Sequence, residues 1–342
     1  MRPSLLTTGL LVSLVIGFAA ALSSGLADEK ELTAEIRVLA GQLVGRINPD
    51  VYGLFTEMCY YEFNGGMWAE MLKSRKFAED DGSDGGYGVV RPWFPIGRSD
   101  RIHFMHDNTV YYCGRQSQKI VSEDAGNNRV GIGQTGLCLL ARSEYQVRLN
   151  LRQDGLNAPV TVALEGDNRI YAEKQIAFSG PEWTRFSFLL RSTHTDKNGR
   201  LTLTFPGKGT LWVGTASLMP TDNTQGFRTD VVRALKALHI PNLRWPGGNM
   251  VSEYRWADGV GDRDKRPPRF TRELWETNDV GIDEFIQLCR LIGTKPYVAV
   301  NAGDGTPEET AALVEYCNGG AETKHGKERR MNGHAEPYNV RL

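Results

Sequence analysis

The sequence predicts an α/β fold with parallel strands that is interrupted by an inserted β-sandwich. Strand patterns alternate with helix patterns near the start of the chain and again after Pro220, and this order implies parallel pairing with right-handed crossovers. Between these parts, short runs with a period of two are separated by Gly, Asn and Asp, which is typical of a β-sandwich. We therefore expect an insert at residues 85–219 within one α/β domain, formed by residues 28–84 and 220–342.

The first segment predicts a secretion signal. Arg2 supplies a positive charge, residues 5–21 are predominantly apolar and uncharged, and small residues up to Ala27 offer a cleavage position. A membrane-spanning helix needs about 20 apolar residues, so this run is short for an anchor. We expect a signal at residues 1–27, a secreted or periplasmic protein, and no membrane contact after cleavage.

The elements before the insert follow from local patterns. Apolar residues at 36–39 and again at 51–55 predict two strands, with a turn at Asn48-Pro49-Asp50 between them. A helical pattern covers residues 67–77. The Asp/Gly-rich stretch at residues 80–88 then has the composition of a linker.

The insert is predicted to consist of strands. Alternating or short apolar runs occur at residues 145–151, 160–164, 183–190, 201–205 and 211–218. Residues 131–136 spell G-x-G-x-x-G, but a dinucleotide-binding loop must open a helix and this one leads into an alternating strand. We therefore expect no cofactor.

After Pro220 the pattern predicts three helices and two strands. The expected elements are a helix capped by Asp230 and ended by Pro241, a strand at 242–245, a helix from Asp283 to Gly293, a strand at 296–300, and a helix ending near Gly319. The last helix has the strongest start signal, because Thr306 and Glu309 form a capping box with Pro307 at the first helical position.

Composition and charge exclude several function classes. The 342 residues carry 40 Lys plus Arg and 41 Asp plus Glu, so the formal charge is −1 and no nucleic acid partner is expected. His103 and His106 have no third ligand at a recognised spacing, and the cysteines match no zinc pattern, so we expect no metal. Nothing in the composition indicates an oligomeric state.

Five cysteines cannot all pair within one chain. Cys113 and Cys138 are the pair that could form a disulfide within the insert, given export to an oxidising compartment. Cys289 and Cys317 lie in helical patterns, where a buried apolar thiol is expected.

Candidate binding residues lie where the predicted parallel strands end. In an α/β barrel the reactive residues follow the carboxyl ends of the strands. Glu57 follows the first such strand, and Arg244 and Asn249 flank the Pro-Gly-Gly turn after the next. A carboxylate, a guanidinium and an amide suit a polyhydroxylated ligand, and Trp275 or Trp245 could stack on a sugar face. Each residue also has a structural reading, as a salt bridge, a cap or a core side chain.

Long motifs resemble the α-L-arabinofuranosidases of glycoside hydrolase family 51. They run over residues 51–57 with Gly65 and Gly66, 243–261, 266–269, 275–278, 283–285, 314–318 and 332–340. Outside the signal and the insert, the resemblance covers nearly the whole chain. The insert looks like a carbohydrate-binding module at residues 131–137 and 145–151.

The resemblance implies a retaining glycosidase that removes arabinofuranosyl groups from arabinose-containing polysaccharides. Glu57, Arg244 and Asn249 would line the arabinofuranosyl subsite of a (β/α)₈ TIM barrel. Both catalytic glutamates of the family would lie beyond Leu342, so we expect no catalytic residue in this chain, a truncated barrel with about four assignable strands, and no activity by itself. A non-catalytic glycan-binding protein acting through the insert, and an endoglucanase, remain alternatives.

Overall fold

A computed structural model describes residues 34–58, 62–78, 88–271 and 275–342. The expected signal at residues 1–27, most of the linker at 80–88, and Cys59 lie outside these ranges. The chain divides into two units, residues 1–48 and residues 49–342, each described by itself. None of the helices in the described ranges combines the length and the apolar character needed to cross a membrane.

In the first unit, residues 34–48 are irregular apart from one turn, so the strand predicted at residues 36–39 is wrong. Ile36 and Val38 are each 83% exposed. Alternating apolar residues form a strand only where a neighbouring strand takes up the backbone hydrogen bonds and one face is buried. Residues 34–48 have neither.

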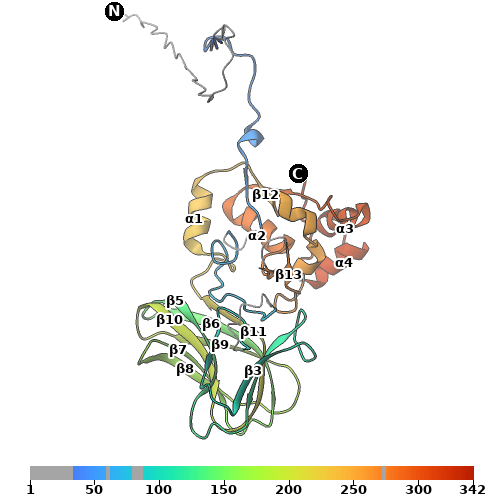
Figure 1. The fold of residues 1–342 in the computed structure, drawn as a ribbon. Helices are drawn as coiled ribbons and strands as arrows, with labels where there is room; N and C mark the ends of the chain where they lie inside the picture. The colour runs from blue at the N-terminus through green and yellow to red at the C-terminus, as the bar shows by residue number, and fades with distance from the viewer. Residues whose placement is uncertain (1–33, 59–61, 79–87, 272–274) are drawn as a thin grey trace, which may run out of the picture. The chain divides into compact units, whose positions relative to one another are not determined.

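The second unit contains a parallel sheet in the order β1-β12-β15 (Figure 1). Its strands are β1 (Leu54–Phe55), β12 (Asn242–Trp245) and β15 (Lys295–Val298). Leu54 pairs with Leu243, and Asn242 pairs with Lys295, both in parallel. Parallel pairing is therefore confirmed, although a short 3-10 turn (Pro49–Tyr52) occupies the first part of the strand predicted at residues 51–55.

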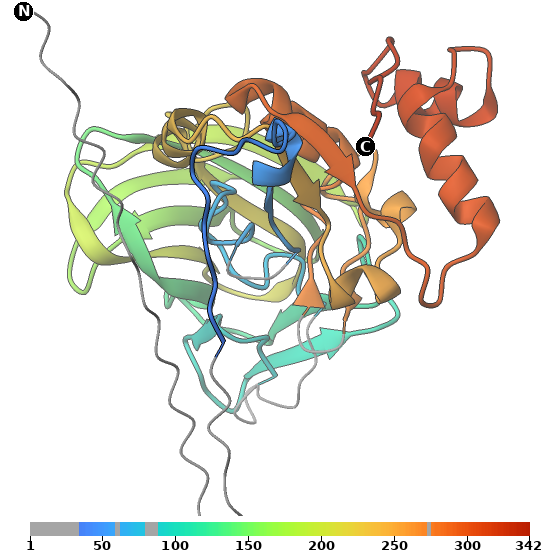
Figure 2. The same ribbon diagram turned by 90° about the horizontal axis from the view of Figure 1, so that it is seen from above.

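Four helices belong to this part: α1 (Thr229–Ala237), α2 (Ile282–Ile292), α3 (Pro307–Asn318) and α4 (Lys324–Met331). Helices α3 and α4 lie side by side in both views (Figures 1 and 2). Short 3-10 turns (Asn249–Glu253 and Trp256–Gly259) and the hairpin of β13 (Arg269–Phe270) and β14 (Trp275–Glu276) fill the connection between β12 and α2.

The helix ends test the capping predictions. The capping box of α3 is confirmed, since Thr306 Oγ1 accepts from Glu309 N at 3.2 Å and Thr306 N donates to Glu309 Oε2 at 3.1 Å. Gly293 ends α2 with a left-handed φ of 76°. Asp230 is not the cap of α1, because Arg228 holds that position and the Asp230 carboxylate pairs with its guanidinium at 2.7 Å.

The middle of the chain forms two five-stranded antiparallel sheets. One has the order β2 (Phe94–Ile96), β5 (Val130–Leu139), β10 (Asp196–Phe205), β7 (Val160–Glu165), β8 (Ile170–Ile176). The other has the order β3 (Ile102–Asp107), β4 (Ser117–Ser122), β11 (Gly209–Pro220), β6 (Glu144–Asp154), β9 (Thr184–Arg191). All five predicted strands of this region are present, and the G-x-G-x-x-G residues lie inside β5 rather than in a loop.

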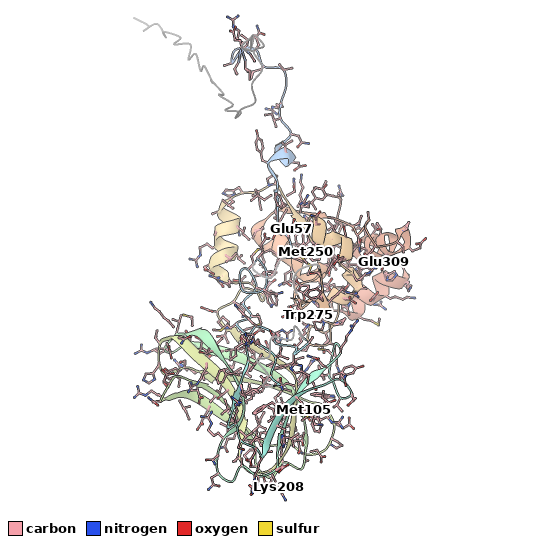
Figure 3. All side chains as sticks on the ribbon, viewed as in Figure 1. Glu57, Met105, Lys208, Met250, Trp275 and Glu309 are labelled. Atoms are coloured by element: carbon pink, nitrogen blue, oxygen red, sulfur yellow. The ribbon has the colours of Figure 1, made fainter. Side chains whose placement is uncertain are left out.

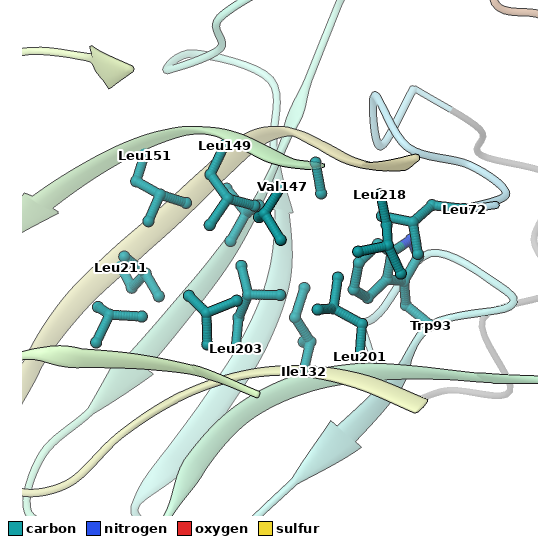
Figure 4. Close-up of a cluster of buried hydrophobic side chains, with 14 of the residues drawn as sticks. Leu72, Trp93, Ile132, Val147, Leu149, Leu151, Leu201, Leu203, Leu211 and Leu218 are labelled. Carbon is teal, nitrogen blue, oxygen red and sulfur yellow. The ribbon is translucent and has the colours of Figure 1, made fainter. Parts of the chain in front are cut away.

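One apolar core joins the two sheets (Figure 4). Ile132 and Leu203 of the first sheet and Leu149 and Leu211 of the second are each fully buried in it. Burying a side chain of this size contributes about 1.5–3 kcal/mol. The two sheets therefore form a β-sandwich, as their alternating pattern predicts.

The helix predicted at residues 67–77 is wrong. Met71 N donates to Leu218 O at 3.0 Å, and Arg75 O accepts from Ala216 N at 2.8 Å, so the segment runs along β11. Phe77 has a positive φ of 52°, which no α-helix allows. Backbone pairing with β11 overrides the local helical pattern.

The described cysteines are all free thiols. Cys113 is buried and Cys138 is exposed, so the disulfide between them is not formed. Cys289 of α2 and Cys317 of α3 are 1% and 3% exposed, and burial raises the pKa of each thiol to about 12. These two are the buried, unreactive thiols that the helical pattern predicts.

Candidate functional site

The predicted residue Glu57 meets the Pro-Gly-Gly turn where the first two parallel strands end. Glu57 follows β1, and its Oε1 accepts a hydrogen bond from Gly248 N, in the turn after β12, at 2.9 Å. Pro246 O in turn accepts from Met58 N at 2.7 Å. These contacts fix the Glu57 carboxylate against the Pro-Gly-Gly turn, at the carboxyl edge of the sheet.

Both glycines of this turn are required by their closeness to Glu57. Gly247 has a φ of +143°, and a Cβ at that position would lie 2.8 Å from Glu57 Cγ. A Cβ at Gly248 would lie 2.8 Å from Glu57 Oε1. A side chain at either position would displace the carboxylate or the turn.

Arg244 lies on β12 beside the strand that leads to Glu57. Its guanidinium carbon is 4.9 Å from the centre of the Phe55 ring, within the range of a cation–π contact. Its Nε is buried and has no hydrogen-bond partner within the described part of the chain. A buried donor without a partner is unusual in native proteins.

The other predicted residues lie in different surroundings. Asn249 is exposed, at the first position of the 3-10 turn that follows Gly248. Trp275 is partly exposed on β14 and contacts Phe270, with ring centres 5.6 Å apart. Figure 3 labels Glu57 and Trp275 among the side chains of the structure. Trp245 is 1% exposed and stacks on Phe285, so it belongs to the core and offers no sugar platform.

A cavity of about 540 Å³ lies beside the ends of β12 and β15, but none of the four predicted residues lines it. Much of its wall is apolar, including Trp245, Trp256 and Val300. Two of its polar groups, Arg255 and Glu309, pair with each other at 2.6 Å. Sugar sites need several polar groups aimed at the ligand, so the Glu57 region is the better candidate.

A buried charge cluster was not predicted from the sequence. Arg75 donates to Asp264 at 2.9 Å and to both oxygens of Asp279, and Lys76 lies 3.3 Å from Asp279. Burial lowers the pKa of Lys76 to about 8. Burial alone would raise the pKa of Asp279, but Arg75 and Lys76 hold it well below its usual range. The cluster ties the segment along β11 to the connection before α2.

Glu276 is also buried. Its Oε1 accepts from Asn278 N at 2.8 Å and from Asn64 Nδ2 at 3.3 Å. Burial raises the pKa of Glu276 to about 7. Glu284 pairs with Arg266 at 2.9 Å and is 5% exposed. Among the described residues, no group of three or more His, Cys, Asp or Glu side chains is placed to hold a metal ion.

Comparison with known proteins identifies relatives for the C-terminal part of the chain. Residues 234–342 match the family model described as alpha-L-arabinofuranosidase 1 domain. The alpha-L-arabinofuranosidase C of Emericella nidulans is 49% identical over 125 residues, which are 36% of this chain and 25% of that protein. An intracellular exo-alpha-L-arabinofuranosidase of Bacteroides ovatus is 42% identical over 137 residues, which are 39% of this chain and 26% of that protein.

Among solved structures, the arabinose complex of the alpha-L-arabinofuranosidase from Thermotoga maritima is 52% identical in sequence. The match covers 34% of this chain and 25% of that one, with a TM-score of 0.34. This chain therefore spans about a quarter of the length of the relatives that it matches.

Proposed function

We propose that this chain carries the arabinofuranosyl-binding part of an α-L-arabinofuranosidase of glycoside hydrolase family 51, the family whose members its C-terminal part resembles. The substrate class that we propose is an arabinose-containing polysaccharide, from which the whole enzyme removes terminal arabinofuranosyl groups. The single observation that supports this assignment best is the hydrogen bond between Glu57 and Gly248, which unites the two motifs that flank the parallel strands.

The chemistry of the Glu57 region suits a sugar ring. The carboxylate of Glu57, which accepts from Gly248 N, is an acceptor of the kind to which sugar hydroxyls donate. Arg244 supplies donors from the neighbouring strand, including the buried Nε that no described residue satisfies. Asn249, which is exposed one residue after Gly248, can both donate and accept. In the proposed complex these groups orient the ring by its hydroxyls.

Hydrolysis with retention needs two carboxyl groups about 5–5.5 Å apart, one as acid and base and the other as nucleophile. We assign neither role to a residue of this chain. Glu57 is proposed as a binding residue, and the buried carboxylates Glu276 and Glu284 are held by Asn278 and Arg266. We therefore propose that the 342-residue chain binds the sugar without cleaving it.

We also propose the architecture that the family implies. The sheet β1-β12-β15 would be the first part of a (β/α)₈ barrel, and the β-sandwich would be an insertion between its first two strands. We also propose that residues 1–27 direct export of the chain to the cell exterior or the periplasm.

Binding of an arabinofuranosyl oligosaccharide to the 342-residue chain, measured by isothermal titration calorimetry, tests the function. Glu57→Gln is expected to weaken binding at least about tenfold, because hydrogen bonds to charged groups contribute about 1.5–3 kcal/mol. Glu322→Gln, the same change at an exposed position in the loop before α4, is the matched control and should leave affinity unchanged. Equal affinities of the Glu57 variant and the wild type would overturn the assignment, as would rapid cleavage of an aryl α-L-arabinofuranoside by this chain.

A further inference from the structure

A second cavity lies where the β-sandwich meets the connection between β12 and α2. Its volume is about 360 Å³, within the range of small-molecule pockets. Arg148 of β6 and Arg185 of β9 line it from the sandwich side, and Asp262, Asp264 and Glu284 line it from the other side. None of the residues of the Glu57 region lines it. We refer to it as the junction cavity.

The polar groups of the junction cavity hold one another in place. Arg185 donates to Asp262 at 2.5 Å, and Arg148 donates to Asp264 at 3.3 Å. Two Nη atoms of Arg266 donate to the two oxygens of Glu284, each at 2.9 Å. Arg266 and Glu284 are fully occupied by one another and by neighbouring backbone and side-chain groups, whereas the hydrogen bonds of Arg148 and Arg185 use Nε and Nη2 and leave Nη1 to face a ligand. The donors and acceptors are thus fixed before a ligand arrives.

The charged groups that line the junction cavity indicate the class of ligand that it can bind. Four arginines and four carboxylates line the cavity, together with Gln287, Asn332 and His334. The numbers of guanidinium and carboxyl groups are equal, so the lining carries no large excess of either charge, and neither an anion nor a cation is favoured by the net field. Dense, alternating donors and acceptors without net charge suit an uncharged polyhydroxyl compound.

An aromatic pair adjoins the cavity on the sandwich side. The hydroxyl of Tyr112 accepts from Arg185 Nη2 at 3.1 Å, and the Tyr112 ring meets Trp183 edge to face with centres 5.5 Å apart. Gly214 of β11 makes room for both, because a Cβ there would lie 2.4 Å from Tyr112 Cβ and 2.8 Å from Trp183 Cζ3. Lys265 Nζ occupies one face of Tyr112 at 3.5 Å from the ring centre. The partly exposed Trp183 is therefore the ring available for stacking.

We propose that the junction cavity and Trp183 form a second glycan subsite, separate from the Glu57 region, that binds the main chain of an uncharged polysaccharide. The identity of that polysaccharide as arabinoxylan or arabinan rests on the proposed function, whereas the class of ligand rests on the cavity itself. The connection that supplies Asp262 and Asp264 starts at the carboxyl end of β12, directly after Gly248. The chain that leaves the Glu57 region at the carboxyl end of β12 therefore goes on to line the junction cavity.

Affinity electrophoresis of the 342-residue chain in gels that contain arabinoxylan, together with titration calorimetry using the same polymer and a short arabinofuranosyl oligosaccharide, tests the proposal. Trp183→Ala should weaken arabinoxylan binding at least about tenfold, the loss expected for one stacking residue, and leave oligosaccharide binding unchanged. Asp262→Asn, at a half-exposed position, should also weaken polymer binding. This variant tests the same subsite if Trp183→Ala does not fold. Tyr297→Ala, which removes an aromatic ring that is 45% exposed on β15, is the matched control and should change nothing.

The outcomes separate this proposal from the preceding one. Polymer binding that depends on Trp183 but not on Glu57 supports the second subsite, even if the short oligosaccharide does not bind and the proposed function fails. Short oligosaccharide binding that depends on Glu57, with polymer binding unaffected by both Trp183→Ala and Asp262→Asn, overturns the second subsite and leaves the proposed function standing. Absence of arabinoxylan and arabinan binding by the folded wild-type chain also overturns it.

Discussion

Replacing Asp279 by Asn removes one negative charge from a place where three charged side chains are almost completely buried. Asp279 accepts from Arg75 Nε at 2.5 Å and from Arg75 Nη2, and Lys76 Nζ lies 3.3 Å away. All three side chains are 1% exposed. The variant leaves two buried cations with less compensating charge, so we expect the free energy of unfolding to fall by about 3–5 kcal/mol. Typical domains are stable by only about 5–15 kcal/mol.

Urea denaturation followed by tryptophan fluorescence measures this loss. Asp230→Asn is the matched control, because Asp230 pairs with Arg228 at 2.7 Å while their side chains are 66% and 46% exposed. Exposed pairs contribute at most about 1 kcal/mol, so the control should lose little. If the Asp279 variant does not fold, Asp264→Asn tests the same cluster, because Asp264 accepts from Arg75 at 2.9 Å. Equal losses at the buried and exposed positions would refute the argument that burial sets the cost.

Two further predictions concern Glu276 and the turn beside Glu57. Burial raises the pKa of Glu276 from 4.5 to about 7, so the folded state binds this proton more tightly and stability falls as pH rises from about 4.5 to about 7, by about 3 kcal/mol. Urea titrations across this range should show that Glu276→Gln reduces the dependence by about 3 kcal/mol, and an unchanged pH profile would contradict the buried carboxyl. Gly247→Ala should weaken arabinofuranosyl binding at least about tenfold in calorimetry, because its Cβ would lie 2.8 Å from Glu57 Cγ. Gly333→Ala, at another positive φ but with no atom near the added Cβ, should leave that binding unchanged.

Elements with local start and stop signals could be predicted from the sequence. The capping box of Thr306 and Glu309 and the left-handed Gly293 are made within a few residues of chain, so the pattern itself contains the interaction. The strands of the sandwich could also be predicted, because apolar residues at every second position mark the buried face of each strand. The proximity of Glu57 to the turn after β12 could also be predicted, because parallel strands bring their carboxyl ends to one edge of the sheet.

The segment at residues 67–77 shows what local patterns cannot supply. Its apolar spacing predicts a helix, yet its backbone partners are Ala216 and Leu218 of β11, about 140 residues further along the chain. The open edge of β11 provides hydrogen-bond partners for backbone groups of this segment, which in a helix would bond to one another. In the sheet, β11 lies between β4 and β6, but β4 pairs only with the first half of β11. The second half of β11 is therefore open to this segment on the β4 side.

The burial of charged residues could not be predicted from the sequence for a related reason. A charge in a sequence is normally solvated, and nothing near Arg75 or Asp279 indicates burial, because each needs the other to make burial tolerable and they lie 204 positions apart. Arg185 and Asp262 at the junction cavity are likewise distant in sequence, 77 positions apart. Both pairs join the β-sandwich side to the connection before α2, but they differ in exposure, since Asp279 is 1% and Asp262 is 44% exposed. Substitution at Asp279 should therefore change stability, whereas substitution at Asp262 should change ligand binding with little effect on stability.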